Sequence, residues 1–126
     1  MARVDTIQLS GTNYQKVGRL NILNVIVANT FTADITFDLI IGDKTLSETS
    51  SSTNAVFVLK DVPIPTGGSL VWDDDGLLTD VFSSGSKINE FNESTKTFTE
   101  LKDKVFLIRI NTSSGTPTAS VLMKRK

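Results

Sequence analysis

The chain has 126 residues, enough for one domain with a sizeable core and too few for two. Thirteen Lys and Arg against fourteen Asp and Glu give a net charge of −1, so overall charge offers no case for nucleic-acid binding. The sequence holds no Cys and no His. This excludes disulfides, thiolate nucleophiles, imidazole bases and the zinc sites built from those residues.

The first 18 residues hold few apolar positions, and only Ile7 to Leu9 reads as a strand. We therefore predict an N-terminal arm over residues 1–18 that lies against a neighbouring subunit. No apolar signal segment follows Met1, and no apolar run reaches the roughly 20 residues that a membrane span requires. We expect no membrane partner.

From residue 19 onward the hydrophobic pattern repeats every second residue, which indicates β-strands. Residues 19–29 are apolar on both faces and rich in β-branched side chains, which is typical of a central strand. The other predicted strands are 33–41, 54–60, 105–111 and 118–124. Turns rich in Gly, Pro, Ser and Asn separate them. The sequence predicts one antiparallel β-sandwich over 19–126, either immunoglobulin-like or jelly-roll-like.

Residues 73–103 form an acidic excursion from this sandwich, with eight acidic and three basic residues. We predict a hairpin within it, with strands on either side of Asn92-Glu93-Ser94. Phe82, Phe91 and Phe98 also lie there, outside the strongest predicted strands. These rings either form a small satellite core or act as anchors that are buried against a partner.

Paired carboxylates are the hydrolase chemistry most compatible with a chain that lacks His and Cys. Asp73, Asp74 and Asp75 are the obvious cluster, but consecutive carboxylates diverge, and Gly76 after them indicates a turn. Their spacing also fails the calcium-loop pattern, which leaves a surface calcium as a minor alternative. We therefore expect no enzyme activity, no catalytic residue, no metal and no cofactor.

The chain ends in a basic tail that is either a solvated end or a partner for an acidic neighbouring subunit. Together with the excursion it supplies the residues that we expect at an interface: Asp73, Asp74, Asp75, Phe82, Phe91, Phe98, Lys124, Arg125 and Lys126.

Two stretches resemble a known family. Residues 54–70, NAVFVLKDVPIPTGGSL, and residues 104–123, KVFLIRINTSSGTPTASVLM, are similar to small β-sandwich virion proteins of tailed, often marine, bacteriophages. The resemblance implies a non-enzymatic homo-oligomer, synthesised in the bacterial cytoplasm and located in the virion. Its partners would be the major capsid protein or neck and tail proteins. This chain departs from the pattern through the insertion at 73–103.

Within that class, a head decoration (cement) protein on the capsid lattice is our first expectation, followed by neck, tail or fibre attachment. The alternative is a carbohydrate- or receptor-binding sandwich at a fibre tip. Sugar-binding sandwiches usually expose Trp or Tyr on a flat face, and this chain has one of each, Trp72 and Tyr14.

Overall fold

A computed structural model of the chain describes residues 3–18, 22–43, 56–73, 89–100 and 104–125. Within these ranges the regular secondary structure consists of β-strands, as the alternating pattern predicts. The strands are β1 (Arg3–Ser10), β2 (Gln15–Gly18), β3 (Ile22–Asn29), β4 (Ile35–Asp43), β5 (Val56–Ile64), β6 (Ser69–Asp73), β7 (Asn89–Asn92), β8 (Thr97–Glu100), β9 (Lys104–Asn111) and β10 (Thr118–Arg125).

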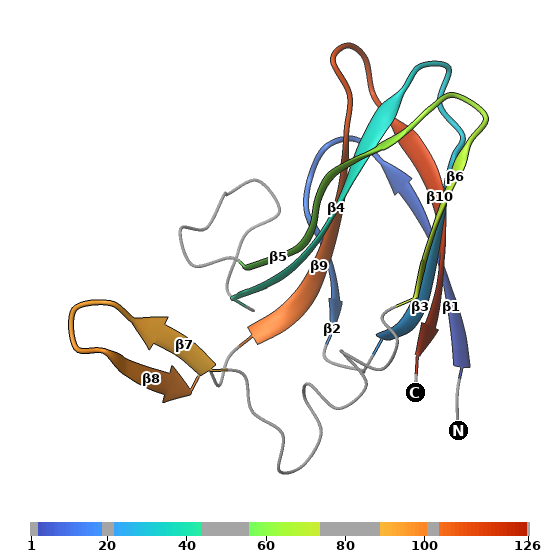
Figure 1. The fold of residues 1–126 in the computed structure, drawn as a ribbon. Helices are drawn as coiled ribbons and strands as arrows, with labels where there is room; N and C mark the ends of the chain where they lie inside the picture. The colour runs from blue at the N-terminus through green and yellow to red at the C-terminus, as the bar shows by residue number, and fades with distance from the viewer. Residues whose placement is uncertain (1–2, 19–21, 44–55, 74–88, 101–103, 126) are drawn as a thin grey trace.

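Eight of these strands form two antiparallel sheets, which Figure 1 shows as facing layers. We call the sheet with strand order β1-β10-β3-β6 sheet A and the sheet with order β2-β9-β4-β5 sheet B. The first strand pairs with the last, and the chain passes from sheet to sheet at most connections. Two four-stranded sheets with these strand orders form a jelly roll. An immunoglobulin sandwich has a different strand order. The predicted β-sandwich is confirmed, and the pairing decides between its two forms.

The main core lies between the sheets and is filled by inward side chains at alternate positions of the strands. On β4, Ile35, Phe37 and Leu39 point inward and are at most 1% exposed. Phe106 of β9 and Met123 of β10 are fully buried beside them. Rings and branched side chains from both sheets therefore fill the interior, which is the main source of stability in such a fold.

The N-terminal segment is part of the sandwich, contrary to the predicted arm over residues 1–18. β1 pairs with β10 along all eight of its residues, from Arg3 opposite Arg125 to Ser10 opposite Thr118. β2 pairs with β9, and Leu9 is buried in the core. The sequence pattern indicated only Ile7 to Leu9 of β1 and missed β2, because both are edge strands, in which many of the alternate positions face solvent and are polar.

One of the predicted Gly- and Pro-rich turns lies between β5 and β6. Gly68 N donates to the Pro65 carbonyl oxygen at 2.8 Å, and Gly67 has φ +75°, a conformation that glycine adopts without steric cost. Pro63 lies in β5, an edge strand of sheet B, where a missing N–H is tolerated.

Candidate functional site

The predicted hairpin in the acidic excursion is confirmed as β7 and β8, which pair antiparallel with Phe91 directly opposite Phe98. The two ring centroids are 5.1 Å apart with the planes tilted by 58°. This distance and tilt lie in the favourable range for an aromatic pair. Phe91 is 42% exposed and Phe98 is 71% exposed. The pair therefore presents apolar surface to solvent and is not the buried centre of a satellite core.

Local hydrogen bonds fix the turn of this hairpin. Asn92 Oδ1 accepts from Ser94 N at 2.9 Å and from Thr95 N at 3.3 Å, while Lys96 N donates to the Asn92 carbonyl oxygen at 2.7 Å. Lys96 has φ +58° and its ammonium lies 3.0 Å from a Glu93 carboxylate oxygen. Both of those side chains are well exposed, so their ion pair contributes little to stability. The Asn92 turn sets the register that places the two rings opposite each other.

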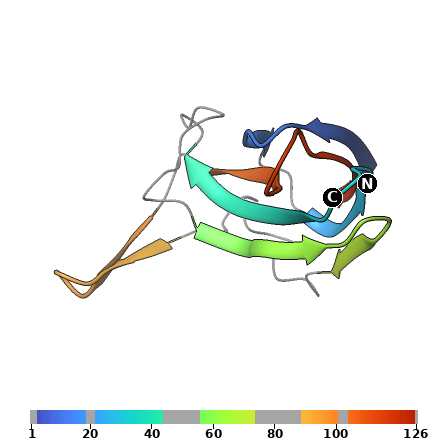
Figure 2. The ribbon, with the colours of Figure 1, turned by 90° about the horizontal axis from the view of Figure 1, so that it is seen from above.

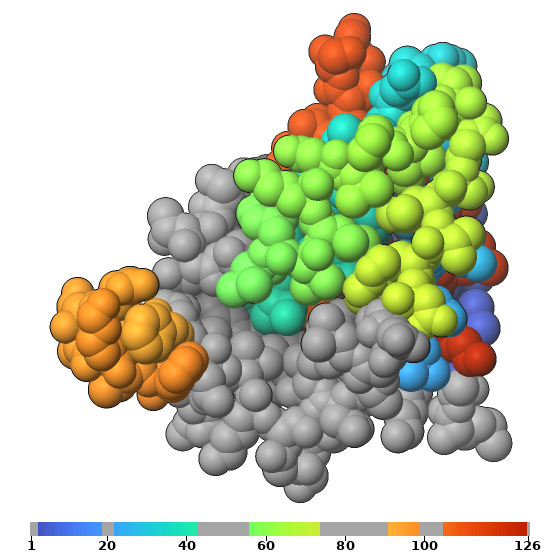
Figure 3. All heavy atoms as spheres, viewed as in Figure 1, coloured from blue at the N-terminus to red at the C-terminus, as the bar shows by residue number. Residues whose placement is uncertain are grey.

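The hairpin stands away from the sandwich in both ribbon views and forms a protrusion in the space-filling view (Figures 1, 2 and 3). A protruding element that carries two exposed aromatic rings has the shape and composition of a docking element. Phe91 and Phe98 form the part of the predicted interface that the structure brings together.

Of the other acidic and aromatic candidates, Asp73 is the one within the described residues. Asp73 is exposed at the end of β6 in sheet A. Asp74, Asp75 and Phe82 lie outside the described residues. Among the described residues, no three acidic groups gather closely enough to hold a metal ion, and no helix is long and apolar enough to cross a membrane.

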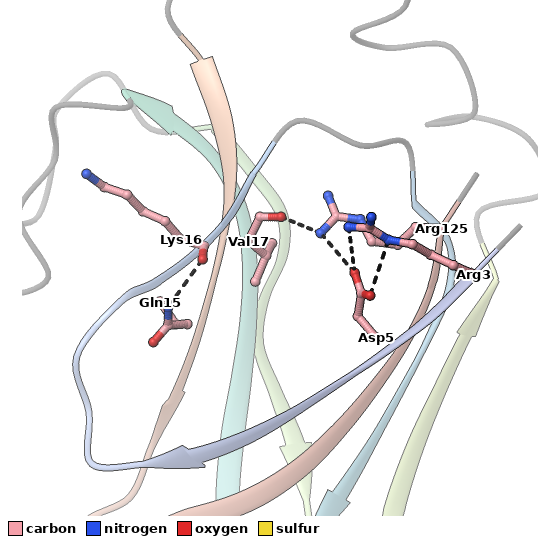
Figure 4. Close-up of polar contacts among 6 residues, drawn as sticks. All are labelled: Arg3, Asp5, Gln15, Lys16, Val17 and Arg125. Atoms are coloured by element: carbon pink, nitrogen blue, oxygen red, sulfur yellow. Dashed lines mark hydrogen bonds and ion pairs between the residues drawn. The ribbon is translucent and has the colours of Figure 1, made fainter.

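The basic tail is not uniformly solvated, and this corrects the expectation for Arg125. Lys124 is exposed on the outer face of sheet A and Lys126 lies outside the described residues, but Arg125 is only 2% exposed. Arg125 Nη1 donates to the Val17 carbonyl oxygen and lies 3.9 Å from a carboxylate oxygen of Asp5 (Figure 4). A signal for this burial was present in the sequence, since position 125 is in phase with Val121 and Met123, which point inward.

Asp5 connects this buried arginine to the surface. Arg3 Nε lies 3.2 Å from one Asp5 carboxylate oxygen, and Arg3 Nη2 donates to the other at 3.3 Å. Burial lowers the pKa of the Arg125 guanidinium, while the negative charge of Asp5 acts in the opposite direction. The cluster links β1, β2 and β10 at one edge of the sandwich, so we assign it a structural role.

No family model matches the sequence, and no curated protein matches it. Two solved structures of infectious bursal disease virus resemble the fold. The structure of the Gx strain has a TM-score of 0.40 and 12% identity, and the match covers 99% of this chain and 33% of that one. The VP2 subviral particle has a TM-score of 0.34 and 14% identity, covering 98% and 32%. This chain thus spans about a third of those viral chains, and the jelly-roll assignment rests on its own strand pairing.

Proposed function

We propose that this chain is a non-enzymatic structural protein of a tailed-phage virion, a head decoration protein that docks on the capsid lattice through the β7–β8 hairpin. The observation that carries the proposal is the exposed Phe91–Phe98 pair at the protruding hairpin. The fold is compatible, because jelly rolls form viral capsid domains, although they also form lectins and cupins. The sequence resemblance to phage virion proteins supports the same class.

The hairpin suits docking for an energetic reason. Its turn is already fixed by the hydrogen bonds to Asn92, so little conformational entropy is lost when a partner covers it. Covering the remaining exposed area of Phe91 and Phe98 then contributes about 25 cal/mol per Å² of apolar surface. Aromatic anchors of this kind often dominate the binding energy of an interface.

Attachment at the neck, tail or fibre is the second possibility within this class, and it would use the same docking element. The alternative of a carbohydrate-binding module is favoured only by the fold, since lectins share the jelly roll. Tyr14 is 8% exposed and Trp72 packs partly buried against the core. These are the chain's one Tyr and one Trp, and their burial leaves no fully open ring of either type for a sugar to stack on.

Quantitative mass spectrometry of gradient-purified particles tests the proposal. A copy number comparable to that of the major capsid protein is the expected result for a decoration protein. A copy number that matches a single ring would move the protein to the neck or tail. Absence from particles would overturn the virion role.

A variant series then tests the docking element. The Phe91→Ser/Phe98→Ser double variant should lower the number of copies per particle at least about tenfold. Phe57→Ser is the matched control, because Phe57 is 40% exposed but lies in β5 of the sandwich. Equal incorporation of the double variant and the wild type would rule out the hairpin as the docking element.

A further inference from the structure

The outer face of sheet A carries a row of apolar side chains where an antiparallel sheet facing water would be polar. Leu122 of β10 pairs with Ile26 of β3, and Ile26 pairs with Val71 of β6. All three side chains point away from the core and are 40–70% exposed. Three neighbouring strands therefore present one continuous apolar strip across the sheet.

The next row toward the chain ends carries opposite charges on either side of β3. Lys124 of β10 pairs with Asn24 of β3, which pairs with Asp73 of β6. Lys124 and Asp73 are both exposed on the same outer face as the apolar strip. They lie two strands apart, which corresponds to about 9.6 Å across the sheet.

On the other side of the strip the face is polar but uncharged. Ser120 pairs with Ala28, which pairs with Ser69, and Ser120 Oγ donates to Gln8 Oε1 at 2.8 Å. These small side chains leave the apolar strip accessible to a flat partner surface.

We propose that this face of sheet A binds the same face of a second copy of the chain, related by a two-fold axis that runs parallel to β3, midway between the two faces. A half-turn about that axis places the partner's β10 opposite β6, the partner's β6 opposite β10, and the partner's β3 opposite β3. Lys124 then faces the partner's Asp73 and Leu122 faces the partner's Val71, while Ile26 faces the partner's Ile26. Two sheets stacked face to face are about 10 Å apart, a gap that a lysine and an aspartate side chain span together.

The shape of the face agrees with this arrangement. A shallow hollow of about 180 Å³ is lined by Val4, Ile26 and Leu122, with Asn24 and Lys124 at its margin. Under the proposed axis the partner's Val71 falls on this hollow. Val71 is 70% exposed, more than Val4, Ile26 or Leu122. The most prominent apolar side chain of the face thus meets its depression, and symmetry makes the contact twice.

The area of this face sets the expected affinity of self-association. Under this axis β10, β3 and β6 face the partner, while β1 extends beyond the partner's β6. Three strands about 4.8 Å apart and three rows about 6.8 Å apart cover roughly 300 Å² per copy. This is less than half of what each partner contributes to a stable interface, so we expect reversible association at roughly micromolar to millimolar concentrations. The inference does not depend on the proposed virion role, because it concerns the isolated chain.

Sedimentation velocity of the full chain over a concentration series from about 10 µM to 1 mM tests self-association. The wild type should shift from monomer toward dimer as concentration rises. Ile26→Lys places two like charges against each other at the axis and should raise the dissociation constant at least about tenfold. Val56→Lys is the matched control, because Val56 is an aliphatic residue 48% exposed on β5 of sheet B, and it should leave the dissociation constant unchanged.

A charge exchange tests the axis itself. Lys124→Asp and Asp73→Lys should each weaken association, and the double exchange should restore it toward the wild-type constant. Circular dichroism melting curves confirm that each variant is folded. A wild type that stays monomeric, an Ile26→Lys variant that associates normally, or a double exchange that does not recover would each overturn the proposal. A monomeric wild type whose Ile26→Lys variant fails to enter particles would assign the face to a different protein.

Discussion

Asn29 of β3 and Ile64 of β5 join the two sheets, since Asn29 Nδ2 donates to the Ile64 carbonyl oxygen at 3.0 Å. The same nitrogen donates to the Ala33 carbonyl oxygen at 2.9 Å, and Asn29 Oδ1 accepts from Phe31 N at 2.8 Å. Asn29 is 6% exposed, so its amide is a buried polar group with both kinds of hydrogen bond satisfied. It ties the connection between β3 and β4 to the end of β5.

Replacing Asn29 should therefore destabilise the fold well beyond the loss of side-chain contacts. Asn29→Ala leaves the Ile64 carbonyl without its side-chain donor in a buried position, and we expect a loss of about 2–3 kcal/mol in the free energy of unfolding. Asn29→Asp should cost more at pH 7, because a carboxylate in place of the amide would face two carbonyl oxygens. Urea unfolding measures both. Asn13 is exposed, so Asn13→Ala serves as the control. A loss of unfolding free energy at Asn29 no larger than at Asn13 would contradict this role.

Some features of the fold could be predicted from the sequence, and others could not. Alternation along 33–41 predicts the inward side chains of β4, and the polar turn at Asn92 predicts the hairpin, because both are local patterns. The pairing of β1 with β10 joins the two ends of the chain, and no local pattern reports such a contact. The choice between immunoglobulin-like and jelly-roll forms depended on that pairing.

The candidate site, too, could be predicted from the sequence only in part. The exposed aromatic pair was one of two alternatives open for Phe91 and Phe98, and only the three-dimensional arrangement decides between them. The burial of Arg125 was missed, because a terminal run of three basic residues reads as a solvated tail. A register shift between Lys124 and Arg125 accompanies the inward turn of the guanidinium.

Gly115 and Gly11 offer a matched pair for separating backbone strain from packing. Both have φ +92°, but a Cβ on Gly115 would lie 3.1 Å from Phe31 Cζ, whereas a Cβ on Gly11 meets nothing within 4 Å. Each Gly→Ala change should lose about 1–2 kcal/mol from the left-handed backbone conformation. Gly115→Ala should lose about 0.5–1 kcal/mol more, because Phe31 must shift against the core it packs on.

Thermal and urea unfolding of the two alanine variants, side by side, measure that difference. Equal losses would mean that the Phe31 ring moves aside freely. A Gly115→Ala/Phe31→Leu double variant should remove most of the extra loss if the ring contact is its cause.

Asp38 gives the fold a pH dependence. Its side chain is 4% exposed, and Oδ1 accepts from Asp61 N at 2.6 Å. Burial raises the pKa of this carboxyl above 3.8. The hydrogen bond from Asp61 N lowers the pKa, while the negative charge of Asp61 raises it further. The positive charges of Arg109 and Lys60 act in the opposite direction.

A raised pKa in the folded state means that the folded chain holds this proton more tightly than the unfolded chain. The stability that the protonated Asp38 contributes is therefore fully present below about pH 3.8, the pKa of this carboxyl in the unfolded chain. It is lost as the pH rises through the higher pKa of the folded chain. Asp38→Asn, which keeps an acceptor for Asp61 N, should raise the free energy of unfolding at pH 7. This advantage should shrink as pH falls toward 3.8. Urea unfolding from pH 3.5 to pH 7 checks it, and a variant less stable at pH 7 would show that attraction to Arg109 outweighs burial.

Asp5 should matter more to stability than Arg3, although the two form the closest ion pair of their cluster. Asp5→Ala removes the carboxylate that faces the buried Arg125, and we expect a loss of about 1–2 kcal/mol. The Arg3 side chain is 59% exposed, so Arg3→Ala should cost no more than about 0.5–1 kcal/mol.

The double variant Asp5→Ala/Arg125→Met tests whether a buried charge is the reason. Methionine retains an apolar stem in the space of the arginine and removes the charge that Asp5 offsets, so the double variant should be more stable than Asp5→Ala alone. The Val17 carbonyl loses its guanidinium donor in this variant, which limits the recovery to part of the loss. Urea unfolding of the wild type, both single variants and the double variant gives the coupling energy. Additive losses would mean that Asp5 supports this edge of the sandwich independently of Arg125.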